Sequence, residues 1–525
     1  MKLFKRIYPL AYEERKPISH PSVRPFRLAF LKAASINFLI LQVLFLGLYS
    51  YIFGSLFQQN EKIHNLNVVF VDYDNGPIGD SIRTAFEQLR GPAFFTLQEK
   101  SPTQFATEQE LRTQVCHVDY WAALFVNAGS STRLAEAIAG NLSSFDNTNL
   151  VEYIWDEVPY SATTDDVIVF NMVTLSAAAQ VAYLTNTTTQ PLRSLDSSSS
   201  VAVGAVAQPW SLTSIDIKET AQGSRLIYNT LVFILVMLQE FFYLGIINGL
   251  FLQTKLFIRV KARRAIFFRT LISVLFTFIG SLVTIGAIWA FRNGWPVNGN
   301  QFVLSWMTVW LLAHVNFLVF DCLSIWLPPP YVPVAMFSWV VVSITSILLP
   351  FSLSSAFYRV GYALPVHEAY ATLIDIWSGG CYPRLYISLP VLFSWEIAAW
   401  CLSSFGVYRR SHYAILGERA QEAAFKQKVC DAIAAKTESE KGESAAATAT
   451  NEEGPLSSQD APRGEAPGVG EPEAYYGGNE EDFDDVERRA SVATRNVNFG
   501  PAFPLALTSS EFGEVDISAR RNTVV

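Results

Sequence analysis

The segment "AASINFLILQVLFLGLYSYIFGSLF", residues 33–57, decides the class of this protein. It lies in a stretch without any charged residue between Lys32 and Glu61. At about 1.5 Å per residue, a helix of this length crosses the roughly 30 Å of a bilayer's hydrocarbon core. The segment also lies too far from the first residue, and is too long, for a secretory signal. We therefore predict a retained transmembrane helix.

The composition agrees with a membrane protein. Of the 525 residues, 50% are hydrophobic, 14% are aromatic and only 16% are charged, whereas a soluble domain is usually about 25% charged. The five cysteines show no C-x-x-C spacing. This excludes a zinc ribbon, a thioredoxin-type site and a disulfide-dense scaffold.

Five further apolar segments predict membrane spans. They begin at Leu226, Thr270, Phe302, Val332 and Leu385. The fourth and fifth spans of the chain are separated by "PPP" at 328–330, because proline removes helix donors. The chain thus has one span, a long hydrophilic insert, and then five spans close together.

Positive charge fixes the expected orientation. Residues 1–32 hold eight Lys or Arg, and the loop "QTKLFIRVKARR" between spans 2 and 3 holds five. The basic segment "RRSHY" follows the sixth span. With six spans, all three basic segments fall on the same side of the membrane. The insert, 58–225, holds nine Lys or Arg against nineteen Asp or Glu and falls on the other. We expect both termini to be cytosolic and the insert to be extracytoplasmic.

The predicted fold class is an α-helical polytopic membrane protein with six spans, an extracytoplasmic α/β domain between spans 1 and 2, and a disordered C-terminal tail. From about Thr437 the chain is rich in Glu, Ser, Ala, Gly and Pro. It cannot bury enough apolar surface to offset its chain entropy. The predicted parts are a basic cytosolic segment at 1–32, the first span at 33–57, the α/β domain at 58–225, a five-helix permease-like domain at 226–408 with an interfacial helix near 365–378, and an acidic cytosolic tail at 409–525.

The stretch "VVFVDYDNG" at 68–76 raises the question of an active site in the insert, since Asp72 and Asp74 are spaced like metal ligands. An EF-hand is excluded, because Gly76 and Arg83 stand at the fifth and twelfth positions. A phosphate-accepting aspartate motif fails as well, and a nucleotide-sugar D-x-D site lacks partner residues. The favoured interpretation is a strand end whose carboxylates are solvated or cap the next helix.

Other segments of the insert predict the rest of an α/β core. "DYWAALFVNAG" at 119–129 reads as a strand by its apolar and aromatic run. "IGDSIRTAFEQL" at 78–89 and "SSTRLAEAIAG" at 130–140 read as helices, the second with Ser130 or Ser131 as its cap. "VIVFNMVTLSAAAQVAYLTN" from Val167 reads as a longer helix packed on the sheet.

Several residues are candidates for covalent modification. "NLS" at Asn141 and "NTT" at Asn186 have the form of N-glycosylation acceptors. "RRAS" gives Ser491 the form of a kinase substrate in the tail. Cys116 and Cys381 both fall on the predicted outer side, where they either pair as a disulfide or remain separate thiols.

The predicted spans contain an unusual set of polar side chains. Charged residues near a bilayer centre cost about 2.5–3.5 kcal/mol each on insertion scales. We predict that Glu240, His314 and Glu396 face a shared polar seam used by substrate headgroups or protons, with histidine's usual pKa of about 6.5 making it pH-sensitive. The alternative is simple hydrogen bonding between helices. The full candidate set is Glu240, Asn248, His314, Asn316, Asp321 and Glu396.

"LPVHEAYATLIDIWSGG" at 364–380 predicts a short helix. Pro365 suits its first turn, and Gly379 and Gly380 end it. Apolar residues recur on one face, while His367, Glu368 and Asp375 lie elsewhere. A helix of about 20 Å is too short to cross a membrane. It is expected to lie in the outer interface or to re-enter the membrane partly, either as an anchor or as a lid over an opening.

A resemblance joins these motifs. The order of one span, "VVFVDYDNGPIG", "YWAALFVNAGSSTRLAEAI", "AQPWSLTSIDI" and, later, "GYALPVHEAYATLIDIWSGG" resembles the fungal nitrosoguanidine-resistance membrane proteins. These are similar in plan to the phage-infection-protein group and to exporter-type ABC permeases. The resemblance covers roughly residues 30–410. It implies a permease-like membrane half and a role in resistance to toxic compounds, and it supplies no catalytic residues.

The expected function is permease-like, in export, lipid handling or resistance to compounds such as nitrosoguanidine. The alternatives are a non-transporting scaffold or regulator, and a membrane-bound enzyme using the carboxylates of the insert. Without a G-x-x-x-x-G-K-[ST] motif the chain has no ATPase of its own. We expect no enzyme activity, cofactor, metal or nucleic-acid partner, but the lipid bilayer, a lipid or hydrophobic substrate and homo-oligomers as partners. The plasma membrane is favoured over endomembranes.

Overall fold

The computed structural model describes residues 20–186, 191–219, 230–292, 297–328 and 331–449. The chain divides into two compact units. Unit 1 comprises Met1–Thr230, Gly294–Pro296 and Ser338–Pro383; unit 2 comprises Leu231–Asn293, Val297–Phe337 and Arg384–Val525.

Unit 1 contains a five-stranded sheet with the order β2-β1-β3-β4-β5. Its strands are β1 (Asn67–Asp72), β2 (Thr96–Lys100), β3 (Ala122–Val126), β4 (Val151–Trp155) and β5 (Leu212–Asp216). β1 pairs in parallel with β2 and β3, β4 is antiparallel to β3, and β5 is parallel to β4. β1 and β3 fall in the two segments of the insert that the sequence predicts as strands.

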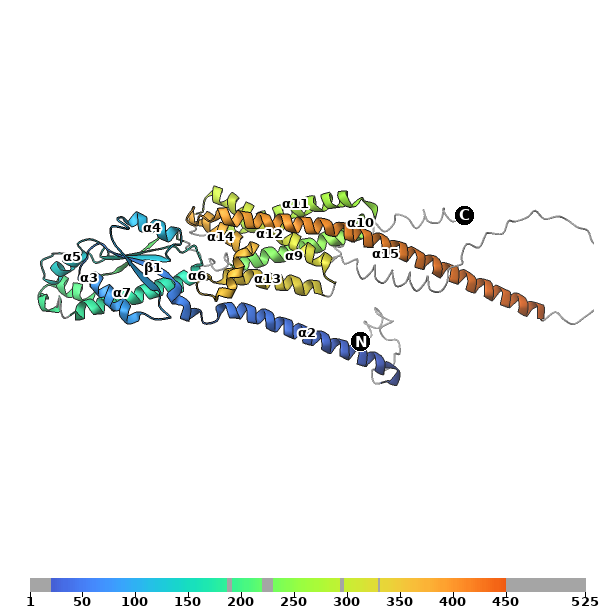
Figure 1. Ribbon diagram of the computed structural model, residues 1–525, viewed down its shortest axis with the longest axis horizontal. Helices are drawn as coiled ribbons and strands as arrows, with labels where there is room; N and C mark the ends of the chain where they lie inside the picture. The colour runs from blue at the N-terminus through green and yellow to red at the C-terminus, as the bar shows by residue number, and fades with distance from the viewer. Residues whose placement is uncertain (1–19, 187–190, 220–229, 293–296, 329–330, 450–525) are drawn as a thin grey trace, which may run out of the picture. The chain divides into compact units, whose positions relative to one another are not determined.

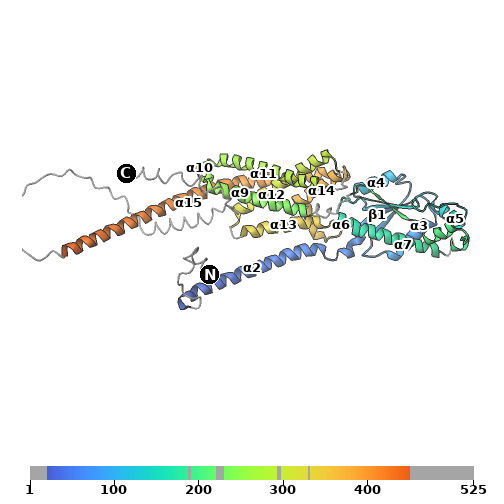
Figure 2. The same ribbon diagram turned by 180° about the vertical axis from the view of Figure 1, so that it is seen from behind.

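The sheet of unit 1 carries helices on both faces. Alternate residues of the strands point to opposite sides, so Val68 and Phe70 join one apolar cluster while Val69 and Val71 join another. The first face is covered by α3 (Pro77–Leu89), α5 (Ser130–Ile138), α7 (Phe170–Thr185) and α8 (Ser200–Ala207); the second is covered by α4 (Glu108–Cys116). Figures 1 and 2 show α4 and α7 on opposite sides of β1.

Short elements complete the sheet domain. They are η3 (Gln59–Asn65), α6 (Ser161–Thr163), the π-helical η4 (Thr164–Val169) and η5 (Pro191–Ser194). A further short helix, η2 (Pro21–Val23), lies directly before the long helix α2 (Arg24–Leu56). The predicted serine cap of α5 is wrong, because its N-cap is Gly129 with φ of 76°. Ser130 begins the helix instead, and the Ser131 hydroxyl accepts the Ile78 N–H.

Unit 1 also includes the long helix α2 (Arg24–Leu56) and the segment from Ser338 to Pro383. This segment holds most of α13 (Val332–Leu348), η8 (Ala356–Ala363) and α14 (Pro365–Ser378). The Tyr358 hydroxyl donates to the Tyr51 carbonyl of α2 at 2.7 Å. The C-terminal end of α2 is thereby fixed to η8.

The predicted helix near 365–378 is confirmed by α14, with Gly379 as C-cap at φ 78°. The three polar residues that the sequence places off the apolar face, His367, Glu368 and Asp375, are all buried as well. His367 stacks on Phe351 with ring centroids 4.9 Å apart. Periodicity identified the apolar face of this helix, but it could not show that protein also covers the polar one.

Unit 2 is a helical bundle. It contains α9 (Val232–Gln253), α10 (Leu256–Arg259), α11 (Ala262–Ala290), α12 (Gly299–Trp326) and α15 (Leu385–Ala449). α12 packs against α9, α11 and α15, which explains why its middle is buried on all sides. A Cβ at Gly280 of α11 would lie 2.7 Å from the Tyr243 hydroxyl of α9, so this glycine permits a close helix crossing.

Six helices are long and apolar enough to cross a membrane among the described residues. They are Arg27–Leu56, Thr164–Thr185, Val232–Gln253, Ala262–Ala290, Gly299–Trp326 and Leu385–Gln427. The second of these is part of the sheet domain's core, as the sequence predicts for the helix from Val167, because Met172, Leu175 and Ala179 are buried there. The predicted fifth span is the shorter helix Val332–Leu348, which ends before Pro350.

The predicted start of the tail at 409 is too early. α15 continues as a helix to Ala449 and extends past the other helices of unit 2 (Figure 1). Its sequence after Arg410 is rich in Ala, Glu, Gln and Lys, which have high helix propensity. The rest of the predicted tail, with Ser491, lies outside the described residues.

Candidate functional site in unit 2

The aspartates of the sheet domain are the first candidates, and they serve the turn after β1. Asp72 is buried, and its Oδ1 accepts the N–H groups of Asp74 (3.1 Å) and Asn75 (2.8 Å). Its Oδ2 pairs with Arg83 at 2.9 Å. Asp74 accepts the Ser131 N–H at 3.1 Å. Among the described residues no group of three His, Cys, Asp or Glu could hold a metal ion. The contacts of Asp72 and Asp74 hold the turn in place.

A network of charged residues lies inside unit 2. Asp321 of α12, which is fully buried, receives Arg269 Nη2 at 2.5 Å and Arg410 Nη1 at 2.9 Å, both on Oδ1. The three charged residues come from α12, α11 and α15, so the network joins three helices. We call Arg269, Asp321 and Arg410 the ion cluster.

Neutral groups extend the ion cluster. Arg269 Nη2 also donates to Asn248 Oδ1 of α9 at 2.7 Å. Arg410 Nη2 donates to the Ser324 hydroxyl at 2.7 Å, and the Ser403 hydroxyl donates to Asp321 Oδ2. The Arg269 guanidinium lies 5.5 Å from the centroid of the Phe251 ring. The cluster thereby connects all four long helices of unit 2.

A second polar group contains His314 and Glu396, which we call the histidine pair. His314 Nδ1 lies 2.6 Å from Glu396 Oε1, and its Nε2 lies 3.2 Å from the Ser273 hydroxyl. His314 is buried, while Glu396 is partly exposed. The imidazole therefore bridges a carboxylate on α15 and a hydroxyl on α11.

Glu240 of α9 is fully buried, and neither of its carboxylate oxygens has a hydrogen-bond partner among the described residues. A carboxylate in this situation is costly as an anion. Glu240 is thus distinct from Glu396, whose Oε1 contacts His314.

The polar groups of unit 2 form two layers. Asn248 and Asp321 each lie five residues before the ends of α9 and α12, at Gln253 and Trp326. Glu240 and His314 lie eight and seven residues further back, which is about 12 Å and 10 Å along the helices. The ion cluster therefore forms an end layer, and Glu240 and the histidine pair form a middle layer.

The structure brings together part of the predicted seam. His314 contacts Glu396, and Asn248 is joined to Asp321 through Arg269. Glu240 is buried at a depth similar to His314 with no hydrogen bond to it, and Asn316 is buried on α12. Asp321, the residue nearest to the end of its span, is the centre of the charged network.

Sequence reasoning missed Arg269 and Arg410. Both stand next to apolar runs, where Lys and Arg are expected to flank a span on its cytosolic side. Arg269 is only 3% exposed and Arg410 only 1%. No local pattern identifies them, since the span that follows Arg269 contains no acidic or amide side chain.

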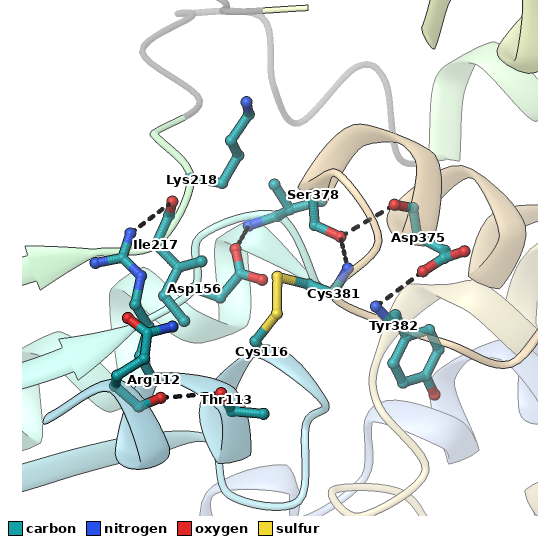
Figure 3. Close-up of a disulfide and its surroundings, with 12 residues drawn as sticks. Arg112, Thr113, Cys116, Asp156, Ile217, Lys218, Asp375, Ser378, Cys381 and Tyr382 are labelled. Carbon is teal, nitrogen blue, oxygen red and sulfur yellow. Dashed lines mark hydrogen bonds between the residues drawn. A yellow bond between two sulfur atoms is a disulfide. The ribbon is translucent and has the colours of Figure 1, made fainter. Parts of the chain in front are cut away.

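A disulfide between Cys116 and Cys381 joins the sheet domain to the segment after α14, with a Cα–Cα distance of 4.5 Å. Figure 3 shows its surroundings. The Ser378 hydroxyl accepts the Cys381 N–H at 3.1 Å, and Asp375 Oδ1 accepts the Tyr382 N–H at 3.0 Å. These bonds fix the turn that presents Cys381.

Asp156 lies among the residues around the disulfide (Figure 3). Its Oδ1 accepts the Val158 N–H at 3.1 Å, while its buried Oδ2 has no partner among the described residues. Burial raises the pKa of Asp156 to about 7, and the nearby Asp216 adds to the effect. Burial also raises the pKa of Asp216 to about 6.

The candidate modification sites differ in exposure. Asn141 is exposed after α5, and Asn186 is partly buried at the end of α7. Their glycosylation stays a prediction.

The remaining cysteines, Cys322, Cys401 and Cys430, are free thiols.

The long apolar helices, joined by buried charged residues, fit a multi-pass membrane protein with a sheet domain in the other unit. The chain belongs to the family described as "Protein of unknown function (DUF3533)", whose model matches residues 37–401. No solved structure matches the chain. The matched range contains the C-terminal part of α2, the sheet domain, the middle layer and most of the end layer.

Proposed function

We propose that this chain is a permease-like membrane protein that handles amphipathic compounds, in export, lipid handling or resistance to toxic compounds. The observation that carries the proposal is the ion cluster within helices long enough to cross a bilayer. Ionisable residues inside membrane helices are costly and usually mark a path for substrates, ions or protons. Hydrogen bonding between helices alone would not need three charged groups.

The proposed orientation places both termini in the cytosol and the sheet domain outside, in the plasma membrane. The segregation of Lys and Arg supports it. The disulfide of unit 1 supports it as well, because disulfides persist in oxidising compartments. The exposed Asn141 is then a glycosylation site.

The finer family assignment is also a proposal. The motif order of the sequence resembles the fungal nitrosoguanidine-resistance proteins and, in plan, exporter-type ABC permeases. On this basis the substrate is a lipid or a hydrophobic toxic compound. The sequence contains no P-loop motif, so the chain recruits a partner ATPase, uses an ion gradient or does not pump at all.

In this proposal the middle layer performs proton or headgroup exchange. His314 can hold a proton between the Glu396 carboxylate and the Ser273 hydroxyl. Glu240 offers a buried carboxylate with both oxygens unused by the described residues. A cationic or protonated group could therefore meet acceptors at this depth.

One observation favours a second candidate function, that of a non-transporting scaffold. α15 continues well beyond the other helices of unit 2, and the side chains from Gln421 to Gln427 are exposed. Such a helix is a surface for docking partners. The third alternative, an enzyme using Asp72 and Asp74, is less favoured because both carboxylates are occupied by the turn.

Transport by purified protein in liposomes tests the proposal. Labelled phospholipid or drug is followed with and without ATP, from pH 5 to pH 8, for the wild type and for Glu240→Gln, His314→Gln and Glu396→Gln. We expect at least one variant to fall by about tenfold, equivalent to about 1.4 kcal/mol. The matched control is Glu136→Gln, an exposed carboxylate of α5. Full activity in all three folded variants would leave the middle layer with a packing role.

Topology is tested separately with tags. Tags at both termini should be protected from protease in intact cells, whereas a tag in the sheet domain should be cleaved. Glycosidase treatment should shift the mass of the wild type but not of Asn141→Gln if this site is used. Cleavage of a C-terminal tag in intact cells would refute the six-span orientation.

A further inference from the structure

The ion cluster carries one positive charge that its single carboxylate does not neutralise. Guanidinium groups remain protonated in proteins. Among the described residues, Asp321 is the one carboxylate that pairs with Arg269 or Arg410. Two guanidinium groups against one carboxylate leave a net charge of +1 in a buried place.

The same residues have unused hydrogen-bond donors. Arg269 Nη1, Arg410 Nε and Asn248 Nδ2 are buried and have no acceptor within the described parts of the chain. Native proteins rarely bury such groups without a partner. The unused groups are all donors, and they belong to the two arginines of the positive surplus and to Asn248 beside them, which points to an anion with several acceptor oxygens as the missing partner.

Neighbouring carboxylates do not fill this role. Glu240 lies eight residues from Asn248, about 12 Å along α9, and its oxygens receive no hydrogen bond from the described residues. Glu396 Oε1 is occupied by His314 at 2.6 Å. The surplus charge is therefore not balanced by a contact within the described part of unit 2.

We propose that Arg269, Arg410 and Asn248 form a binding site for a phosphate group, carried by a phospholipid or present as free phosphate. Arginine pairs with phosphate through several parallel N–H groups, and a phosphate offers more acceptor oxygens than a carboxylate. The role as substrate site rests on the proposed function, whereas phosphate binding itself is measured without transport.

The depth of the site favours the lipid source. Asn248 and Asp321 lie five residues, or about 7 Å, from the ends of their helices. This end of unit 2 carries the exposed basic residues Arg259 and Lys261, at the end of α10 and just before α11, which attract anionic headgroups. A lipid phosphate at this level reaches the cluster without crossing the hydrocarbon core.

The test is the thermal stability of purified full-length protein after delipidation. The melting temperature is measured in chloride and in inorganic phosphate at equal ionic strength, and in nanodiscs containing phosphatidic acid or, as a neutral counterpart, diacylglycerol. The site predicts stabilisation by phosphate, phosphatidic acid or both, and none by diacylglycerol. Stabilisation by phosphatidic acid alone identifies a phospholipid as the source of the phosphate group. Stabilisation by inorganic phosphate identifies the free anion.

Variants separate the site from general charge effects. Arg269→Gln should weaken the apparent affinity at least tenfold, whereas Arg263→Gln, an exposed arginine of the same helix, should leave it unchanged. Asp321→Asn removes the competing carboxylate and should tighten binding at least tenfold. Equal affinity of Arg269→Gln and Arg263→Gln, or no gain in Asp321→Asn, would overturn the proposal.

If the variants do not fold, the melting temperatures of the wild-type protein alone still test the proposal. Melting temperatures that are equal in chloride, phosphate, phosphatidic acid and diacylglycerol would overturn the site. Transport that fails while phosphate still stabilises the protein would reject the permease function and leave the site intact.

Discussion

The two units of the molecule use buried charge in opposite ways. In the sheet domain, Asp72 is surrounded by two backbone N–H groups and Arg83, so its charge holds a turn. In unit 2, Arg269 and Arg410 share one carboxylate and keep donors that no described residue uses. A charge that is fully used by its surroundings indicates structure, whereas a buried charge left partly unused points to a ligand or a proton.

The largest effect is expected from breaking the ion cluster. Asp321→Asn leaves two buried guanidinium groups without a counter-charge, which typically costs about 3–5 kcal/mol. In phosphate-free detergent this variant should show a much lower melting temperature than the wild type. A wild-type melting temperature would mean that the cluster contributes nothing to the bundle.

The disulfide gives the next largest effect. Cys116→Ser should destabilise the protein by about 2–5 kcal/mol, because the bond constrains a separation of 265 residues. Thermal unfolding without reductant measures this loss, and dithiothreitol should reproduce it in the wild type. Cys401→Ser, which alters a free and exposed thiol, is the control. Indifference of the wild type to reductant would contradict the prediction.

Asp156 is the exception in the sheet domain, and it should make unit 1 pH-sensitive. With a folded pKa of about 7, the carboxyl keeps a proton that the unfolded chain releases near pH 4. Stability should therefore fall as pH rises from about 4 to about 7 and stay low above that range. The loss is about 2–4 kcal/mol at 1.36 kcal/mol per pKa unit.

Asp156→Asn checks this sign. The amide oxygen can still accept the Val158 N–H, while the charge is gone. The variant should be more stable than the wild type at pH 8 and should show a flatter dependence between pH 5 and pH 8 in thermal unfolding. A parallel decline in both proteins would assign the pH dependence to other groups.

The smallest effect is expected at the turn after β1. Asp72→Asn combined with Asp74→Asn removes a partly exposed ion pair and weakens turn hydrogen bonds, for a loss of about 1–2 kcal/mol. Activity per folded molecule should stay near the wild-type value. A folded, correctly located double variant without activity would show that these carboxylates have a chemical role.

The sequence predicts most of the elements because they depend on local pattern. The apolar runs identify α2, α9, α11, α12 and the start of α15, and the proline and glycine signals bound α14. The sequence does not predict contacts between residues that lie far apart along the chain. Arg269 and Arg410 read as flanking charges, and only the packing of α11 and α15 on α12 brings them to Asp321. The pattern of α14 likewise shows an apolar face without showing what covers the rest.

The disulfide has a consequence for the order in which this protein matures. Cys116 and Cys381 are 265 residues apart, so at about 5–20 residues per second the second cysteine is synthesised about 13–50 s after the first. The helices α9 to α13 are made during this interval. A nascent chain that stops before residue 381 thus retains a reactive Cys116 thiol. The bond can therefore form only after the ribosome has passed α14, with α15 still to be synthesised.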